Sequence, residues 1–207
     1  MVYTNINPMQ DVRRYLQPSQ VIKILESASD SKGWRRDRDV LLIGLLAYTG
    51  RRVGEILRIK MEDILWDEQQ IYFNILKKKH KTKVLKPINS TIWKLLSKYI
   101  ADNKWYEGDY VFKSSWDTDK PISGARVRQI VYHYCDRAGI PNFEPGKRVH
   151  PHTFRHSFAV AASKKLKNPG DLRKLQKALE HSKIDITTFY LQFHDEEQRE
   201  IMEEVYS

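Results

Sequence analysis

The stretch RRDRDVLLIGLLAYTG, residues 35–50, is charged for one turn and then almost entirely apolar. A helix that is apolar on every face is typical of a position buried on all sides. Gly50 follows the apolar run, and glycine is the residue most often found just beyond the end of a helix. We therefore expect a central buried helix that ends at Gly50.

Helical patterns also occur on both sides of this segment. Apolar residues recur at helical spacing, and Ser19 and Ser90 are placed to cap two of the expected helices. The expected helical ranges are 19–28, 53–60, 90–100, 123–134, 152–165, 171–179 and 185–191. Most of the chain is therefore predicted to be helical.

A change in residue type after Trp66 predicts a small sheet. Residues 71–76 are rich in β-branched and aromatic side chains, and residues 84–88 form a suitable partner strand. The lysine-rich segment between them is expected to be the turn of a hairpin. The predicted fold class is mainly α (α+β), a single helical domain with a small antiparallel β-sheet.

The charge balance narrows the class of partner. The chain has 207 residues, with 36 Lys and Arg against 26 Asp and Glu, which gives a formal charge of +10. Its hydrophobic fraction of 41% is that of a folded protein rather than of a disordered basic chain. A folded domain with this excess of positive charge points to a polyanion, and nucleic acid is the first candidate.

Cysteine content and hydropathy bear on location. Cys135 is the one cysteine, which excludes an internal disulfide framework and a zinc site built from several cysteines. No uncharged apolar stretch approaches 18 residues, and no apolar core suited to a signal peptide follows Met1. We therefore expect a cytoplasmic protein with no membrane span.

Two arginines directly follow the predicted central helix. Arg52 precedes Glu55 by three residues, so the two side chains can pair on one face of a short helix. Such a pair is often no more than a solvated helix start. Alternatively, Arg52 presents its planar guanidinium to a phosphate while Glu55 holds it in place. The pattern alone leaves both interpretations open.

The predicted hairpin turn is strongly basic. Six lysines occur from Lys77 to Lys86, with no acidic residue among them. An exposed turn can carry lysines for solubility alone, but this density favours contact with phosphates. The pattern does not say which lysine matters.

His152 can be paired in two ways. His152 and His156 have the i,i+4 spacing of zinc ligands on a helix. Zinc is disfavoured because Thr153 stands where a metalloprotease has glutamate, and because Arg155 would repel a dication. His152 and Arg155, at i,i+3, combine a group that transfers protons with a fixed cation, which suits anion chemistry. We therefore expect no metal.

His181 and Tyr190 stand nine residues apart near the end of the chain. A tyrosine there is usually a packed aromatic residue. Its phenol, with a reference pKa of about 10, is a nucleophile only where cations favour the phenolate or a base accepts its proton. By themselves, these residues predict a basic helical domain that binds a phosphodiester and leave open whether it cuts one.

Taken in order, the residues resemble the motifs of the tyrosine recombinase (phage integrase) family. The similarity runs from about Tyr15 to Tyr190 and covers most of the chain. It implies a helical catalytic domain with a small sheet, in agreement with the patterns above. It also implies a catalytic set that works without metal or cofactor, with Glu55 in support: Arg52, Lys79, His152, Arg155, His181 and Tyr190.

The resemblance further implies a role for each side chain. Tyr190 would attack a DNA phosphodiester and form a 3′-phosphotyrosyl link, while Arg52 and Arg155 stabilise the phosphate oxygens. His152 would accept the tyrosine proton and His181 would donate a hydrogen bond to the phosphate. A lysine of the hairpin would protonate the departing oxygen.

The resemblance also locates the catalytic lysine, and the chain departs from the family pattern beside the catalytic residues. Similarity to the end of the family's second strand places the general acid at Lys79, with Lys78 as the close rival. Arg51 stands where the family usually has an apolar residue, and Glu180 stands where it usually has glycine. Neither departure removes a catalytic residue.

The resemblance also suggests a division of the chain. Residues 1–192 would be the catalytic domain, with no N-terminal core-binding domain, and residues 193–207 would be a C-terminal helical tail. The tail is acidic, carries Ile201, Met202 and Val205, and resembles a family helix that docks on a neighbouring protomer. Packing on its own domain is the alternative. We expect a homo-oligomer, a tetramer on DNA.

The resulting prediction is a site-specific recombinase or integrase of a mobile element that acts on double-stranded DNA. The alternatives are a non-catalytic DNA-binding regulator with the same fold and a type IB topoisomerase-like relaxing enzyme. Basic residues expected to contact DNA around the catalytic set are Lys77, Lys78, Lys81, Lys83, Arg126, Arg128, Lys147 and Arg148.

Overall fold

The computed structural model describes residues 15–33, 35–77, 80–141 and 148–165, and at residues 76, 77, 80 and 81 it describes the backbone alone. The elements follow in this order: α2 (Pro18–Ser29), α3 (Arg36–Thr49), α4 (Val53–Leu57), the 3-10 helix η1 (Met61–Asp63), β1 (Ile64–Leu65), β2 (Gln70–Lys77), β3 (His80–Pro87), α5 (Ser90–Ala101), α6 (Gly124–Arg137) and α7 (Pro151–Ser163). The predicted fold class is confirmed. The helices expected over 171–179 and 185–191, and the tail expected over 193–207, lie outside the described residues.

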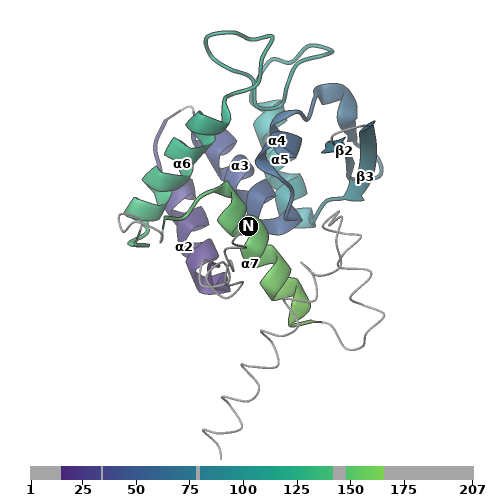
Figure 1. The fold of residues 1–207 in the computed structure, drawn as a ribbon. Helices are drawn as coiled ribbons and strands as arrows, with labels where there is room; N and C mark the ends of the chain where they lie inside the picture. Colours follow the sequence, from purple (N-terminus) through teal and green to yellow (C-terminus); the bar gives the residue numbers. More distant parts are fainter. Residues whose placement is uncertain (1–14, 34, 78–79, 142–147, 166–207) are drawn as a thin grey trace, which may run out of the picture.

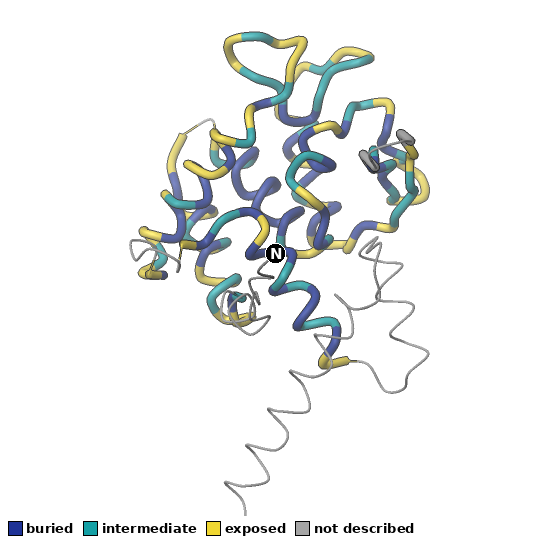
Figure 2. The backbone as a smooth tube through the Cα atoms, in the orientation of Figure 1, coloured by how far each residue is buried: buried dark blue, intermediate teal, exposed yellow. Residues whose placement is uncertain are grey.

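α3 is the centre of the domain. Every residue from Arg38 to Leu46 is buried, and α2, α5 and α7 all pack against this helix. Figure 2 shows the buried backbone gathered around it, whereas the long loop between α5 and α6 is mostly half-buried or exposed. The predicted end of the helix is also confirmed, because Gly50 adopts a left-handed conformation (φ 59°) directly after Thr49.

The other helices lie around α3 in two groups. α2 and α6 contact each other on one side, α4, α5 and the sheet lie on the other, and α7 runs across the front (Figure 1). α3 and α6, with 14 residues each, are the longest of the described helices. Within the described ranges, no helix is long and apolar enough to cross a membrane.

A close approach between α3 and α5 depends on a glycine. A Cβ placed on Gly44 would lie 2.6 Å from Cδ1 of Ile92, a buried residue of α5. That separation is well inside van der Waals contact, so a larger residue at position 44 requires Ile92 to move. The missing Cβ at Gly44 therefore sets the spacing of these two helices.

The sheet is antiparallel with the strand order β1-β2-β3. Phe73 pairs with Val84 and Lys77 pairs with His80, so the predicted hairpin is confirmed and its strands are longer than predicted. Alternate residues of β2 are buried against the helices, namely Ile71, Phe73 and Ile75. The sequence pattern did not predict β1, because a strand of two residues is too short to show an alternation.

Two of the predicted helix caps are wrong. α2 begins at Pro18, whose missing N–H suits the first helical position, and the backbone N–H of Gln17 donates to Oε1 of Gln20 at 2.9 Å. α5 is capped by Asn89, whose side chain accepts from the backbone N–H of Thr91 at 2.8 Å. In each case an amide residue before the expected serine takes the capping position.

Replacing Gly44 by alanine is expected to destabilise the protein through Ile92. The new Cβ overpacks the interface between α3 and α5 at a cost of about 1–3 kcal/mol. The better helix propensity of alanine offsets roughly 1 kcal/mol of that cost. Ile92→Val removes the methyl group that the new Cβ would meet, so the double variant should be more stable than the sum of the single effects predicts.

Urea unfolding of the wild type, the two single variants and the double variant measures this coupling. Gly124→Ala is the matched control, because a Cβ at that helical position would meet no atom within 4 Å. Strictly additive effects of Gly44→Ala and Ile92→Val would contradict the contact.

Candidate active site

Arg155 is anchored to the end of the central helix. Its Nη1 donates to the carbonyl oxygen of Gly50 at 2.7 Å, and the side chain is only 5% exposed. The left-handed turn at Gly50 ends α3 and leaves this carbonyl outside the hydrogen-bond pattern of the helix. The contact joins residues 105 positions apart. It joins α7, which carries Arg155, to the end of α3.

Arg52 lies directly after the same turn. Its Nη1 forms an ion pair with Oε1 of Glu55 at 3.0 Å, and its backbone N–H donates to Oε2 of Glu55 at 3.2 Å. The predicted pairing is therefore confirmed. The carboxylate is buried whereas 44% of the Arg52 side chain is exposed. A guanidinium that pairs with a buried carboxylate on one side can still donate hydrogen bonds to an anion on its exposed side.

Arg51 has a role in this cluster that the sequence did not reveal. Its side chain is 2% exposed, and its guanidinium carbon lies 5.3 Å from the ring centroid of Phe73. Its Nη1 lies 3.8 Å from Oε2 of Glu55. The cation thus fills a position where apolar packing was expected, and it shares Glu55 with Arg52. The i,i+4 spacing of Arg51 and Glu55 was the signal that could have indicated this.

His152 lies in the first turn of α7, three residues before Arg155. Its side chain is exposed, and its ring centroid is 6.4 Å from that of His150. The helix start is fixed by Pro151 and by a hydrogen bond from the backbone N–H of His150 to Oγ1 of Thr153 at 3.1 Å. His152 and Arg155 therefore lie on one helix at the predicted i,i+3 spacing, with His152 exposed and Arg155 buried.

The N-terminal segment also fixes α7. The backbone N–H of Leu16 donates to Oγ of Ser157 at 2.7 Å, and that hydroxyl donates to the carbonyl of Thr153 at 2.8 Å. Both partners are buried. The helix that carries Arg155 is thereby held at two points that are far apart in sequence. A buried serine within a helix gave no specific signal of this contact in the sequence.

Lys83 is held at the edge of the sheet by a carboxylate. Its Nζ lies 2.7 Å from Oδ1 of Asp63, which is almost completely buried and also accepts from the backbone N–H of Lys60. The hydrogen bond and charge of Asp63 raise the pKa of Lys83. Half of the Lys83 side chain remains exposed. Lys83 therefore ties the middle of β3 to η1 through Asp63, whether or not it also contacts DNA.

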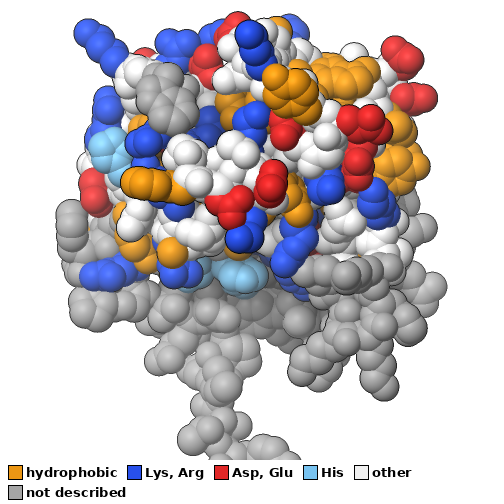
Figure 3. Space-filling model, turned by 90° about the horizontal axis from the view of Figure 1, so that it is seen from above, with side chains coloured by type: hydrophobic (Ala, Val, Ile, Leu, Met, Phe, Trp, Pro, Cys, Tyr) orange, Lys and Arg blue, Asp and Glu red, His pale blue; other side chains and the backbone are white. Residues whose placement is uncertain are grey.

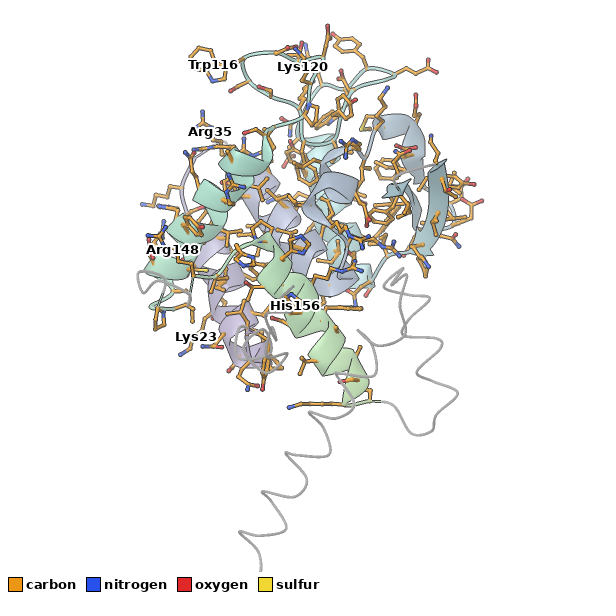
Figure 4. All side chains as sticks on the ribbon, viewed as in Figure 1. Lys23, Arg35, Trp116, Lys120, Arg148 and His156 are labelled. Atoms are coloured by element: carbon orange, nitrogen blue, oxygen red, sulfur yellow. The ribbon has the colours of Figure 1, made fainter. Side chains whose placement is uncertain are left out.

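The other predicted DNA contacts lie on different elements. Arg126 and Arg128 are exposed on α6, where Nη1 of Arg126 donates to Oε1 of Gln129 at 3.1 Å. Arg148 is exposed, with its guanidinium carbon 6.0 Å from the ring centroid of Tyr132. Figure 4 shows Arg148 beside α6, away from His156 on α7.

The remaining predicted residues are not placed. Lys78, Lys79, Lys147, His181 and Tyr190 lie outside the described residues, as do the side chains of Lys77 and Lys81. Within the described part of the chain, no group of three or more His, Cys, Asp or Glu side chains is arranged to hold a metal ion.

The chain matches known proteins over most of its length. The profile of the phage integrase family covers residues 14–197. A tyrosine recombinase from Pseudothermotoga lettingae is 30% identical over 200 residues, which are 92% of this chain and 63% of that protein. The chain thus spans less than two thirds of the length of this relative.

Solved structures share the fold. The crystal structure of XerA recombinase superposes with a TM-score of 0.70 at 25% identity and covers 93% of this chain and 65% of that one. The XerH site-specific recombinase, in a post-cleavage complex with palindromic difH substrate, gives a TM-score of 0.75 at 22% identity and covers 96% of this chain and 55% of that one.

Removing the buried carboxylate is expected to destabilise the site strongly. Glu55→Ala leaves the buried cation of Arg51 without its counter-charge, which costs about 3–5 kcal/mol. Because the two residues share one interaction, Arg51→Leu combined with Glu55→Ala should cost less than the two single variants together. Denaturant unfolding measures the difference. Glu62→Ala, which removes an exposed carboxylate, is the control, and an equal loss for Glu55→Ala and Glu62→Ala would contradict the shared pairing.

Proposed function

Because the chain belongs to the phage integrase family, we propose that it is a site-specific recombinase or integrase that cleaves and rejoins DNA. Its substrate is double-stranded DNA, and a mobile element is the expected source. The relatives carry recombinase names, and XerH is described in complex with a DNA substrate. Action on chromosomal DNA would place the protein with the nucleoid in the cytoplasm.

The arginine pair is the observation that carries the proposal. Arg155 and Arg52 are about a hundred residues apart in sequence, and the fold brings both to the turn at Gly50. The carbonyl oxygen of Gly50 holds Arg155, and a carboxylate oxygen of Glu55 holds Arg52. Fixed guanidiniums aimed at one place stabilise charge that develops on a phosphate during its transfer. A merely solvated pair at a helix start would not require the buried anchor at Gly50.

In the proposed reaction, the hydroxyl of Tyr190 attacks the phosphorus of a phosphodiester. The new bond joins the tyrosine oxygen to the 3′-phosphate, and the bond to the 5′-oxygen breaks. His152 accepts the phenolic proton, and Lys79 gives a proton to the departing 5′-oxygen. Arg52 and Arg155 bind the non-bridging oxygens throughout.

The covalent link preserves the energy of the broken ester. A 5′-hydroxyl of a second strand can therefore attack the phosphotyrosyl bond and release the protein without ATP. His181 would donate a further hydrogen bond to the phosphate. Since the guanidiniums supply the positive charge, the proposed reaction proceeds without a metal ion.

A nicked duplex carrying the DNA that flanks the gene is expected to trap a covalent adduct in the presence of EDTA. The short fragment between the cleavage site and the nick carries the new 5′-hydroxyl, and its release prevents religation. The adduct therefore accumulates and is visible by denaturing gel electrophoresis. Tyr190→Phe should abolish it. Arg52→Ala and Arg155→Ala should slow its formation by at least about a hundredfold, with only modest loss of DNA binding.

Different outcomes would exclude different parts of this proposal. An adduct that persists in Tyr190→Phe would rule out the nucleophile. Salt-sensitive DNA binding without any adduct would favour a regulator with the same fold. Relaxation of supercoiled plasmid without recombinant products would favour a topoisomerase-like enzyme.

We also propose that the tail, residues 193–207, docks on a neighbouring protomer to form the tetramer on DNA. An apolar groove of about 460 Å³ between α2, α3 and α7 supports this. Ile22 and Tyr48, which line it, are 49% and 41% exposed, and Lys165 lies at its edge. The tail offers complementary apolar side chains at Ile201 and Val205 among acidic residues.

Ile22→Glu and Val205→Glu are each expected to reduce the number of protomers that assemble on DNA. A charge on either surface opposes burial of the apolar contact. Native mass spectrometry of the protein with its DNA substrate measures the stoichiometry. Tyr106→Glu is the control, because it changes an exposed aromatic residue in the loop between α5 and α6, outside the groove. Full assembly of both charged variants would exclude this docking surface.

A further inference from the structure

Arg51 is a buried cation directly beside the proposed phosphate site. Its side chain is 2% exposed, which is the burial of a core residue. Arginine is seldom buried to this extent, and a buried charge costs free energy unless other groups compensate it. The proposed reaction gives this side chain no role. Its position next to Arg52 therefore calls for an explanation.

The turn that ends α3 fixes the backbone of Arg51. The backbone N–H of Arg51 donates to Oγ1 of Thr49 at 3.2 Å, and that hydroxyl donates to the carbonyl oxygen of Leu45 in α3. The side chain of Arg51 thus begins from a backbone that is tied to the central helix.

The guanidinium of Arg51 lies between Glu55 and the sheet. Its Nη1 is 3.8 Å from Oε2 of Glu55, and its central carbon is 5.3 Å from the ring centroid of Phe73 in β2. Phe73 is completely buried, and α4 packs against β2 beside it (Figure 1). A cation over the face of an aromatic ring is attracted by the ring electrons. The carboxylate and the ring together restrict where this guanidinium can lie.

Glu55 is oriented by both arginines. Its Oε1 accepts from Nη1 of Arg52 at 3.0 Å, whereas its Oε2 faces Arg51 and accepts from the backbone N–H of Arg52 at 3.2 Å. Without Arg51, more of the charge of this buried carboxylate would act on the guanidinium of Arg52. Pairing of Arg52 with Glu55 would then compete more strongly with pairing to a phosphate.

Arg51 also changes the net charge next to the phosphate site. Arg51, Arg52 and Glu55 together carry one net positive charge, because two cations face one anion. Without Arg51 the remaining pair would be neutral. Buried charges are only weakly screened by water and salt, so their effect extends over several ångströms. Arg51 can therefore act on a phosphate that it does not touch.

We propose that Arg51 is a positioning residue for Arg52 in DNA cleavage. It fixes the carboxylate of Glu55 and takes up part of its charge, so that the exposed side of Arg52 remains available to the reacting phosphate. The inference rests on the proposed function for the reaction in which Arg52 acts.

Single-turnover cleavage of the nicked duplex, with protein in excess, measures the rate constant of adduct formation separately from binding. Arg51→Met keeps a long apolar side chain and removes the charge. We expect it to slow adduct formation about tenfold. The affinity for the duplex should change little, because many other contacts hold the DNA. Arg51→Lys keeps the charge and should retain most of the rate, and an equal loss in both variants would contradict a role through charge.

A neutral substrate distinguishes this role from a structural one. A methylphosphonate at the cleaved position replaces one charged oxygen by a methyl group, which removes the repulsion between the phosphate and the attacking oxygen of the tyrosine. Guanidiniums that offset this repulsion then matter less. The ratio of the wild-type rate constant to that of Arg51→Met should therefore fall towards one. The same ratio with both substrates would indicate a packing defect and overturn the proposal.

Lys98→Met is the matched control for the loss of one positive charge. Nζ of Lys98 lies 3.4 Å from Oδ1 of Asp37 in the first turn of α3, at the other end of this helix from Gly50, and half of the Lys98 side chain is exposed. An exposed pair of this kind contributes little. Figure 3 looks onto the end of the domain with the loop between α5 and α6, where Lys and Arg side chains lie among acidic and apolar ones. Lys98→Met should cleave at the wild-type rate.

Inorganic phosphate provides a readout that does not require cleavage. Its binding can be followed by NMR at the Nε–Hε group of Arg52, with the signal assigned by Arg52→Lys. Arg51→Met should bind phosphate severalfold more weakly than the wild type, because its Arg52 pairs more strongly with Glu55.

The two readouts separate the inference from the proposed function. If the wild type forms no adduct, the proposed chemistry is refuted and the phosphate titration decides alone: weaker binding by Arg51→Met sustains the inference, and equal binding refutes it. If the wild type and Arg51→Met form the adduct at the same rate, the chemistry stands and the inference is refuted.

Discussion

The left-handed turn at Gly50 is the constraint on which the candidate site depends. It ends the most deeply buried helix, and its carbonyl accepts the hydrogen bond from Arg155. Arg52 follows two residues later, at the N-cap position of α4. A residue with a side chain adopts this backbone conformation at a cost, whereas glycine adopts it freely. The positions of both guanidiniums thus depend on the end of α3. This end of the helix cannot shift without disturbing the core.

The arginines beside Gly50 share one carboxylate, that of Glu55. Glu55 is buried and faces Arg51, which is also buried, and Arg52, which is partly exposed. A buried cation requires a nearby counter-charge, so Arg51 and Glu55 stabilise each other in the interior. Arg52 and Arg155 then add positive charge that this carboxylate cannot balance. The excess makes the surface above Gly50 favourable for a phosphate.

Local sequence patterns predicted much of this arrangement, but they could not predict contacts between residues far apart in the sequence. The apolar run of α3 and the i,i+3 pairing of Arg52 with Glu55 are encoded within a few residues. The contact of Arg155 with Gly50 depends on how α7 packs, which no spacing records. The pairing of Lys83 with Asp63 likewise depends on the folded sheet. The capping residues predicted for α2 and α5 were wrong because neighbouring polar residues compete for the same backbone donors.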